Sequence, residues 1–153
     1  GHLLADESLR IIAGSAVQQN AELRCLSRKI DLPIDSEMMR YILAKSPIKM
    51  TSVRDNIVTT RLNFAQIGDA RILTIPGEAL PNIGYYLKRK MKTDHAFLFG
   101  LTNDAFGYML TKVDFNSFKR YEYISRTSLG EMTGEIYIRE AENWLNELLP
   151  TKQ

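Results

Sequence analysis

Two strand-forming runs separated by only two residues place the tightest limit on how this chain can fold. Residues 57–67 (IVTTRLNFAQI) and 70–75 (ARILTI) are rich in β-branched and aromatic residues, which favour strands. Gly68-Asp69 lies between them, and glycine at the first central position is typical of a type II′ turn. The sequence therefore predicts a β-hairpin whose second strand leads directly into Pro76-Gly77-Glu78.

A helix and another strand are predicted after the hairpin. Residues 79–92 carry apolar residues at helical spacing, and Pro81 suits a first helical turn. Residues 95–101 (HAFLFGL) form a continuous apolar run, which is typical of a strand covered on both faces. Strand–helix–strand units are almost always parallel and right-handed. Residues 70–101 therefore predict a βαβ unit whose two strands end at the same edge of the sheet.

The flanking segments predict helices around this sheet. Apolar periodicity indicates an opening helix at 5–22, a second helix from Asp35 to about Lys45, and a final helix at 135–149. The final helix is expected to bury Ile136, Ile138, Ala141, Trp144, Leu145 and Leu148.

Two further segments have strand character. Residues 24–32 alternate, with Leu26, Arg28, Ile30 and Leu32 on one face. Tyr121, Tyr123 and Ile124 indicate a short strand or an ordered loop. The predicted fold class is therefore α/β, with α+β as the alternative. It comprises a mixed sheet with a hairpin and a right-handed βαβ unit, helices packed on it and a C-terminal helix.

The length and charge of the chain narrow its class. A chain of 153 residues suits one domain, here residues 3–153, because Gly1-His2 resembles a cloning remnant. The net charge is only +2, and Lys88, Arg89, Lys90 and Lys92 form the one tight basic cluster. We interpret this cluster as the solvated end of a helix, because nucleic-acid surfaces usually need a broader basic face. No nucleic-acid partner is expected.

The cysteine count and the hydropathy pattern exclude a disulfide framework, a cysteine metal cluster and a membrane span. Cys25 is the only cysteine, so neither an internal disulfide nor a cysteine metal cluster is possible, and we expect a small core residue. The sequence contains no apolar run as long as a membrane span and no pattern typical of a signal peptide.

Little in the sequence suggests chemistry apart from Glu78 and Tyr108. Each follows an apolar run that is predicted to be a buried strand, so a carboxylate and a phenol could meet at one sheet edge. Oxygen ligands of this kind can hold a hard or borderline metal. Alternatively, Glu78 serves the first turn of a helix and Tyr108 packs its ring with the hydroxyl outward. His95 is expected to be structural, since the only other histidine is His2.

The order and spacing of several short motifs resembles the neutral/alkaline, non-lysosomal ceramidase family. These motifs are Ile75-Pro76-Gly77-Glu78, Gly100-Leu101-Thr102-Asn103, Gly107-Tyr108 with Thr111, Tyr121-Glu122, and Thr133-Gly134 before the last helix. The resemblance is to the C-terminal part of that family's catalytic domain and is clearest from about residue 57 to 149.

The resemblance implies a zinc-dependent amidohydrolase that cleaves the N-acyl amide of ceramide or a related lipid amide. In that family two histidines, a glutamate and a tyrosine bind one zinc ion, and the motifs place the glutamate at Glu78 and the tyrosine at Tyr108. A second tyrosine, which lines the catalytic centre, corresponds to Tyr121. The zinc histidines, and a serine and an arginine of the site, belong to motifs upstream of those present here. We therefore expect a fragment that, alone, is inactive, holds no zinc and tends to self-associate.

Some residues depart from the family pattern. Asp104-Ala105-Phe106 and Met109-Leu110 differ near the expected acyl-chain approach, so the substrate is left open between ceramide and another N-acyl amide. The alternative function is a non-catalytic, metal-free ceramidase-like domain with a binding or oligomerisation role. An upstream reading frame that encodes histidine motifs favours the enzyme, whereas a start codon close to Leu3 favours the alternative.

Overall fold

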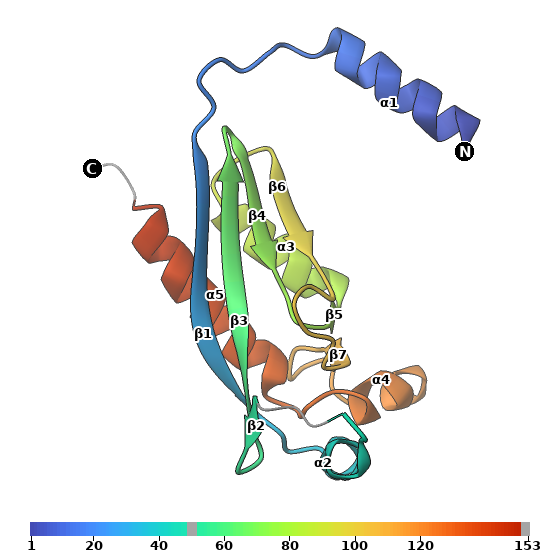
Figure 1. Ribbon diagram of the computed structural model, residues 1–153. Helices are drawn as coiled ribbons and strands as arrows, with labels where there is room; N and C mark the ends of the chain where they lie inside the picture. Colours follow the sequence, from blue (N-terminus) through green and yellow to red (C-terminus); the bar gives the residue numbers. More distant parts are fainter. Residues whose placement is uncertain (49–51, 151–153) are drawn as a thin grey trace.

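A computed structural model describes residues 1–48 and 52–150 of the chain (Figure 1). Its elements, in order, are α1 (His2–Gly14), β1 (Leu23–Pro33), α2 (Glu37–Lys45), β2 (Val53–Arg54), β3 (Ile57–Ile67), β4 (Ala70–Thr74), β5 (Glu78–Ala79), α3 (Pro81–Lys90), β6 (Ala96–Phe99), β7 (Tyr108–Met109), a 3₁₀ turn η1 (Lys119–Tyr121), α4 (Glu122–Arg126) and α5 (Thr133–Leu148). The mixed α/β class and the C-terminal helix are therefore confirmed.

The predicted hairpin is formed by β3 and β4. The two strands pair antiparallel, with Ile67 opposite Ala70. Gly68 has φ +57°, while Asp69 is outside the left-handed region, as a type II′ turn requires. The long strand β1 pairs antiparallel with the other edge of β3, from Leu23 opposite Ile67 to Pro33 opposite Ile57.

The predicted strand–helix–strand unit is also present. β4 pairs in parallel with β6, and α3 connects them, so the main sheet has the order β1-β3-β4-β6 with β2 attached to β3. The basic residues Lys88, Arg89 and Lys90 occupy the last turn of α3, as expected for a solvated helix end. Lys90 forms an ion pair with Glu142 at 2.6 Å.

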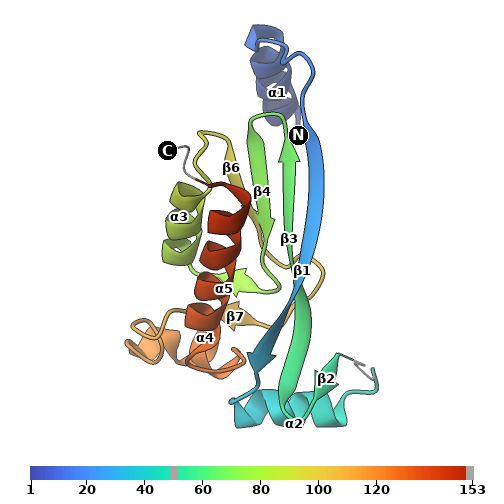
Figure 2. The same ribbon diagram turned by 90° about the vertical axis from the view of Figure 1, so that its left-hand side faces the viewer.

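Helices α3 and α5 cover one face of the sheet, and the core lies between them and the strands (Figure 2). Fully buried aliphatic residues come from every layer of this core, including Leu32, Leu62, Leu73, Ile83 and Leu145. Tyr137 of α5 is also fully buried and donates a hydrogen bond from its hydroxyl to the Thr74 carbonyl at 2.5 Å. The sequence periodicity did not include Tyr137 in the buried face of α5, although Ala141, Trp144 and Leu145 are buried as predicted.

Among the described residues, no helix lies on the opposite face of the sheet in either view (Figures 1 and 2). The register aligns Cys25, Ala65, Ile72 and Phe97 across β1, β3, β4 and β6 on this face. Two expectations are therefore wrong. Phe97 and Phe99 are 44% and 47% exposed, so β6 is covered on one face only, and Cys25 is exposed rather than in the core.

The first helix is also shorter than the sequence predicts. The spacing predicted a helix at 5–22, but α1 ends at Gly14, and Ser15 has an extended backbone. Every residue from Gly1 to Leu23 is exposed. Figure 1 shows α1 beyond the end of the sheet, apart from the rest of the fold.

The segment with Tyr121, Tyr123 and Ile124 is helical, not a strand. It forms η1 followed by α4. Tyr121, Ile124, Ser125 and Ser128 are more buried than the exposed residues between them. Their spacing is that of a helix and not the alternation of a strand.

Candidate functional site

Main-chain hydrogen bonds hold the two motifs side by side. Phe106 N donates to Pro76 O at 2.9 Å, Glu78 N to Gly107 O at 2.9 Å, and Leu80 N to Met109 O at 3.0 Å. The short strands β5 and β7 pair in parallel as a second, two-stranded sheet, and Glu78 is the register partner of Tyr108. The two side chains singled out from the sequence are therefore neighbours.

Glycines at two positions allow this close approach. Gly107 has φ +80°, and a Cβ atom there would lie 1.8 Å from the Thr127 carbonyl oxygen. A Cβ atom on Gly77 would lie 2.5 Å from the carbonyl oxygen of Gly107. Any larger residue would separate the motifs or displace the end of α4.

Glu78 and Tyr108 interact electrostatically. The negative charge of Glu78 raises the pKa of the Tyr108 phenol above its ordinary value, and desolvation and a hydrogen bond to the same carboxylate add to this effect. Glu78 is exposed and Tyr108 is half-buried, so the pair is accessible from solvent. The raised pKa keeps the Tyr108 phenol protonated at neutral pH.

A second aromatic residue, Tyr123, contacts Tyr108 of this pair. The ring of Tyr123 on α4 meets the ring of Tyr108 edge-on, with centroids 5.9 Å apart and an interplanar angle of 71°. The amide of Tyr108 donates to Thr127 O at 3.2 Å, so the end of α4 is fixed against β7. No pattern in the sequence distinguishes Tyr123 from its neighbours, because its contact with Tyr108 depends on α4 being a helix.

Tyr121 lies at the end of η1. Its ring packs edge-on against Phe118 at 5.5 Å, and the guanidinium of Arg120 lies 5.4 Å from the ring centroid. Its assignment to the catalytic centre therefore stays a prediction that follows from the resemblance.

Other motif residues brace the surrounding loops. Thr60 donates to the Asp104 carboxylate at 2.5 Å, which ties the loop before β7 to the middle of β3. Asp114 accepts hydrogen bonds from Thr111 at 2.6 Å and from Asn82 at 2.7 Å. These contacts join the loop after β7 to the start of α3.

The oxygen donors of Glu78 and Tyr108 fit part of a metal site. A carboxylate and a phenol are suitable ligands for zinc, but a zinc site generally needs three or four protein ligands. Within residues 1–48 and 52–150, no group of three or more His, Cys, Asp or Glu side chains is placed to hold a metal ion. His95 is exposed and lies just before the N-terminal end of β6. The Glu78–Tyr108 pair lies beyond the other, C-terminal end of that strand. Glu78 and Tyr108 therefore offer two adjacent oxygen donors.

Two solved ceramidase structures share this fold. The neutral ceramidase from Pseudomonas aeruginosa matches with a TM-score of 0.50 and 19% sequence identity, over 63% of this chain and 16% of that chain. A ceramidase complexed with C2 matches with a TM-score of 0.51 and 16% identity, over 80% of this chain and 21% of that chain. No protein family and no curated protein matches the sequence.

The structural likeness agrees with the family resemblance in the sequence, and at these identities it shows a ceramidase-like fold. The chain spans 16% and 21% of the length of the two ceramidases. No helix in the described part of the chain is long and apolar enough to cross a membrane.

Proposed function

We propose that this chain is the C-terminal part of a zinc-dependent amidohydrolase that cleaves the N-acyl amide of ceramide or a related lipid amide. The observation that carries the proposal is the in-register pairing of Glu78 with Tyr108 on a fold shared with ceramidases. The remaining ligands would come from a part of the protein that lies outside this sequence.

Glu78 and Tyr108 would hold the metal by one oxygen each. An amide resists hydrolysis, and a zinc ion bound there would polarise its carbonyl and lower the pKa of a bound water to about 7. Glu78 supplies the negative charge that attracts the cation. The raised pKa of Tyr108 means that its proton competes with a metal for the phenol oxygen, so metal affinity should increase with pH.

The phenol of Tyr121 would line the catalytic centre and donate a hydrogen bond to the developing oxyanion. Loss of a comparable donor costs about 2.7–4 kcal/mol of transition-state stabilisation in other enzymes. In the structure the Tyr121 ring packs on Phe118 and lies beside the Arg120 guanidinium.

The test of this proposal uses the polypeptide encoded by the whole reading frame and a fluorogenic N-acyl sphingosine substrate. We expect hydrolysis that Tyr121→Phe reduces by about 100-fold or more, as loss of an oxyanion donor does elsewhere. Tyr85→Phe is the control, because Tyr85 is an exposed tyrosine of α3 and should not matter. A full-length protein with no amidase activity, or a Tyr121→Phe variant with unchanged turnover, would count against the assignment.

We also propose that the 153-residue chain has no amidase activity and self-associates. Two oxygen ligands cannot replace a set of four, and one face of the sheet is exposed and partly apolar. Turnover of the same substrate by the isolated chain would contradict the first statement, and a monomer at high concentration the second.

A further inference from the structure

Helix α1 is amphipathic, and in the part of the chain that the structure describes none of its side chains is buried. Leu4, Ser8, Ile11 and Ile12 recur at helical spacing on one side, and Asp6 and Arg10 lie round the other. Leu4, Ile11 and Ile12 are 74%, 53% and 69% exposed. A helix of 13 residues is marginally stable by itself in water, so its apolar side needs something to pack against.

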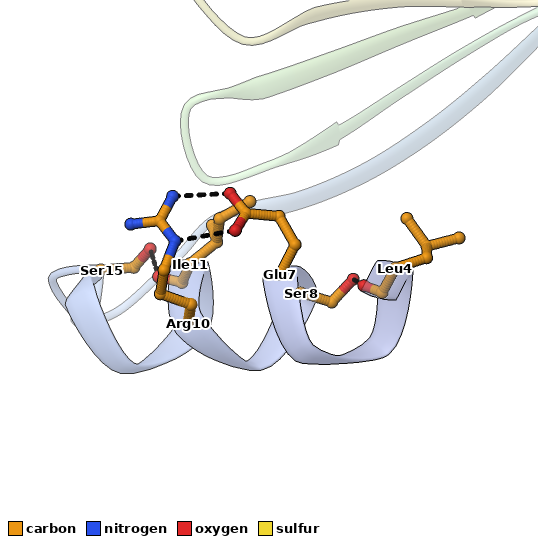
Figure 3. Close-up of polar contacts among 6 residues, drawn as sticks. All are labelled: Leu4, Glu7, Ser8, Arg10, Ile11 and Ser15. Atoms are coloured by element: carbon orange, nitrogen blue, oxygen red, sulfur yellow. Dashed lines mark hydrogen bonds and ion pairs between the residues drawn. The ribbon is translucent and has the colours of Figure 1, made fainter. Parts of the chain in front are cut away.

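The apolar side of α1 can lose water at little cost. Ser8 lies within it and already donates to the Leu4 carbonyl at 2.8 Å, and Ser15 donates to the Ile11 carbonyl at 2.7 Å (Figure 3). Glu7 and Arg10 form an ion pair with each other at 2.6 Å (Figure 3). No hydroxyl on the apolar side would be left unpaired if another apolar surface covered it.

The bare face of the sheet provides a second unpartnered apolar surface. We call it the open face; its apolar residues are Leu23, Cys25, Ala65, Ile67, Ile72, Phe97 and Phe99, and Ser27, Asn63 and Thr74 share the same face. Leu23 and Ile67 are 71% and 54% exposed, at the end of the sheet from which the chain leaves toward α1. Phe97 and Phe99 contact each other edge-on with ring centroids 6.3 Å apart, so they present one continuous aromatic surface.

The sizes of the two surfaces match. α1 has 13 residues and is therefore about 20 Å long. β1, β3, β4 and β6 lie side by side over a patch that is roughly 15–20 Å in each direction, given about 3.3 Å per residue and 4.8 Å between strands. One such helix-on-sheet contact falls short of the ~800 Å² per partner of a standard interface, whereas a reciprocal pair of contacts approaches it.

The link between α1 and β1 directs the helix away from its own sheet. Gln18 accepts a hydrogen bond from the Asp69 amide at 3.2 Å, which fixes the link at the tip of the β3–β4 hairpin. α1 then lies beyond the end of the sheet in both views (Figures 1 and 2). A helix held out in this way is available to another molecule.

We propose that two copies of this chain pair by exchanging α1, so that the apolar side of each α1 packs on the open face of the other copy. The contact is isologous and is made twice, as in a domain-swapped dimer. This proposal rests on the self-association proposed above and is independent of the metal site.

The experiment compares oligomeric state by light scattering over a wide concentration range. We expect the wild-type chain to dimerise and Ile12→Lys to raise the dissociation constant at least tenfold, equivalent to about 1.4 kcal/mol. Ala13→Lys is the matched control, because Ala13 neighbours Ile12 in sequence but lies away from the apolar side. Phe97→Lys on the open face should also weaken the dimer, and Tyr85→Lys on exposed α3 should not.

Mixing the two weakened variants distinguishes exchange from other modes. A mixed dimer of Ile12→Lys and Phe97→Lys keeps one intact contact, so the mixture should dimerise more strongly than either variant alone. Cys25 provides a second readout, since it lies on the open face and should be alkylated faster in Ile12→Lys than in the wild-type dimer.

Three outcomes would overturn the proposal. A wild-type monomer at every concentration would remove self-association altogether. A dimer that resists Ile12→Lys but not Phe97→Lys would show that the open faces pair directly, and self-association would stand. A monomer in which Cys25 is protected until Ile12 is replaced would show that α1 covers its own sheet.

Discussion

Replacing Gly107 with alanine should destabilise the fold at the point where the two motifs meet. Gly107 has φ +80°, and moving an ordinary residue into the left-handed region costs about 1–2 kcal/mol. The new methyl group would also lie 1.8 Å from the Thr127 carbonyl oxygen, so α4 must shift. That shift breaks the hydrogen bond from Tyr108 N to Thr127 O, which is worth about 0.5–1.5 kcal/mol. We expect a total loss of about 2–3 kcal/mol.

Urea unfolding followed by circular dichroism measures this loss. Gly84→Ala is the matched control, because Gly84 lies within α3 and its new methyl group would be 3.8 Å from the nearest atom, on Leu98. That variant should gain about 0.5–1 kcal/mol from the better helix propensity of alanine. If the free energy of unfolding of Gly107→Ala lies within about 0.5 kcal/mol of the wild-type value, the contact between β7 and α4 is not what the structure shows.

Three further predictions concern Tyr137, Glu78 and the pH dependence of stability. Tyr137→Phe should lower stability by about 1–3 kcal/mol, because it leaves the buried Thr74 carbonyl without its donor, and urea unfolding at neutral pH will show whether it does. Burial raises the pKa of Tyr137 well above its usual value, so its contribution is present below pH 10 and is lost as the pH increases through the folded-state pKa. Wild-type stability should therefore fall more steeply above about pH 10 than that of Tyr137→Phe, and parallel curves would contradict this. Glu78→Gln should lower the pKa of Tyr108 toward its ordinary value, which NMR titration of labelled tyrosines measures, with Glu122→Gln as the control. An unchanged pKa of Tyr108 in Glu78→Gln would mean that the two side chains do not interact.

The sequence predicted the hairpin, the parallel β4–β6 pair and α5 because strong local signals coincide with their tertiary environment. Gly68 at a two-residue turn fixes the register of β3 and β4, and that register continues into β6 through α3. The adjacency of Glu78 and Tyr108 follows from the same logic, since both residues come after neighbouring parallel strands.

The structure differs from the sequence predictions where an apolar or strand-like pattern does not correspond to burial or to a strand. The apolar run at 95–101 suggested a strand covered on both faces, yet within residues 1–48 and 52–150 the side of β6 that carries Phe97 and Phe99 stays exposed. Cys25 is exposed for the same reason. Tyr123 was not distinguished because its contact with Tyr108 depends on the helical turn of α4, which strand-like composition concealed.

Zinc content tests the central claim, that Glu78 and Tyr108 supply part of a metal site, most directly. Elemental analysis of the protein expressed from the whole reading frame should find one zinc per chain, and Glu78→Gln and Tyr108→Phe should each lose most of it. Glu122 is an exposed carboxylate on α4, so Glu122→Gln should keep its zinc. The 153-residue chain alone should hold little or no zinc. Full zinc occupancy in both the Glu78→Gln and the Tyr108→Phe protein, or one tightly bound zinc in the isolated chain, would contradict the account.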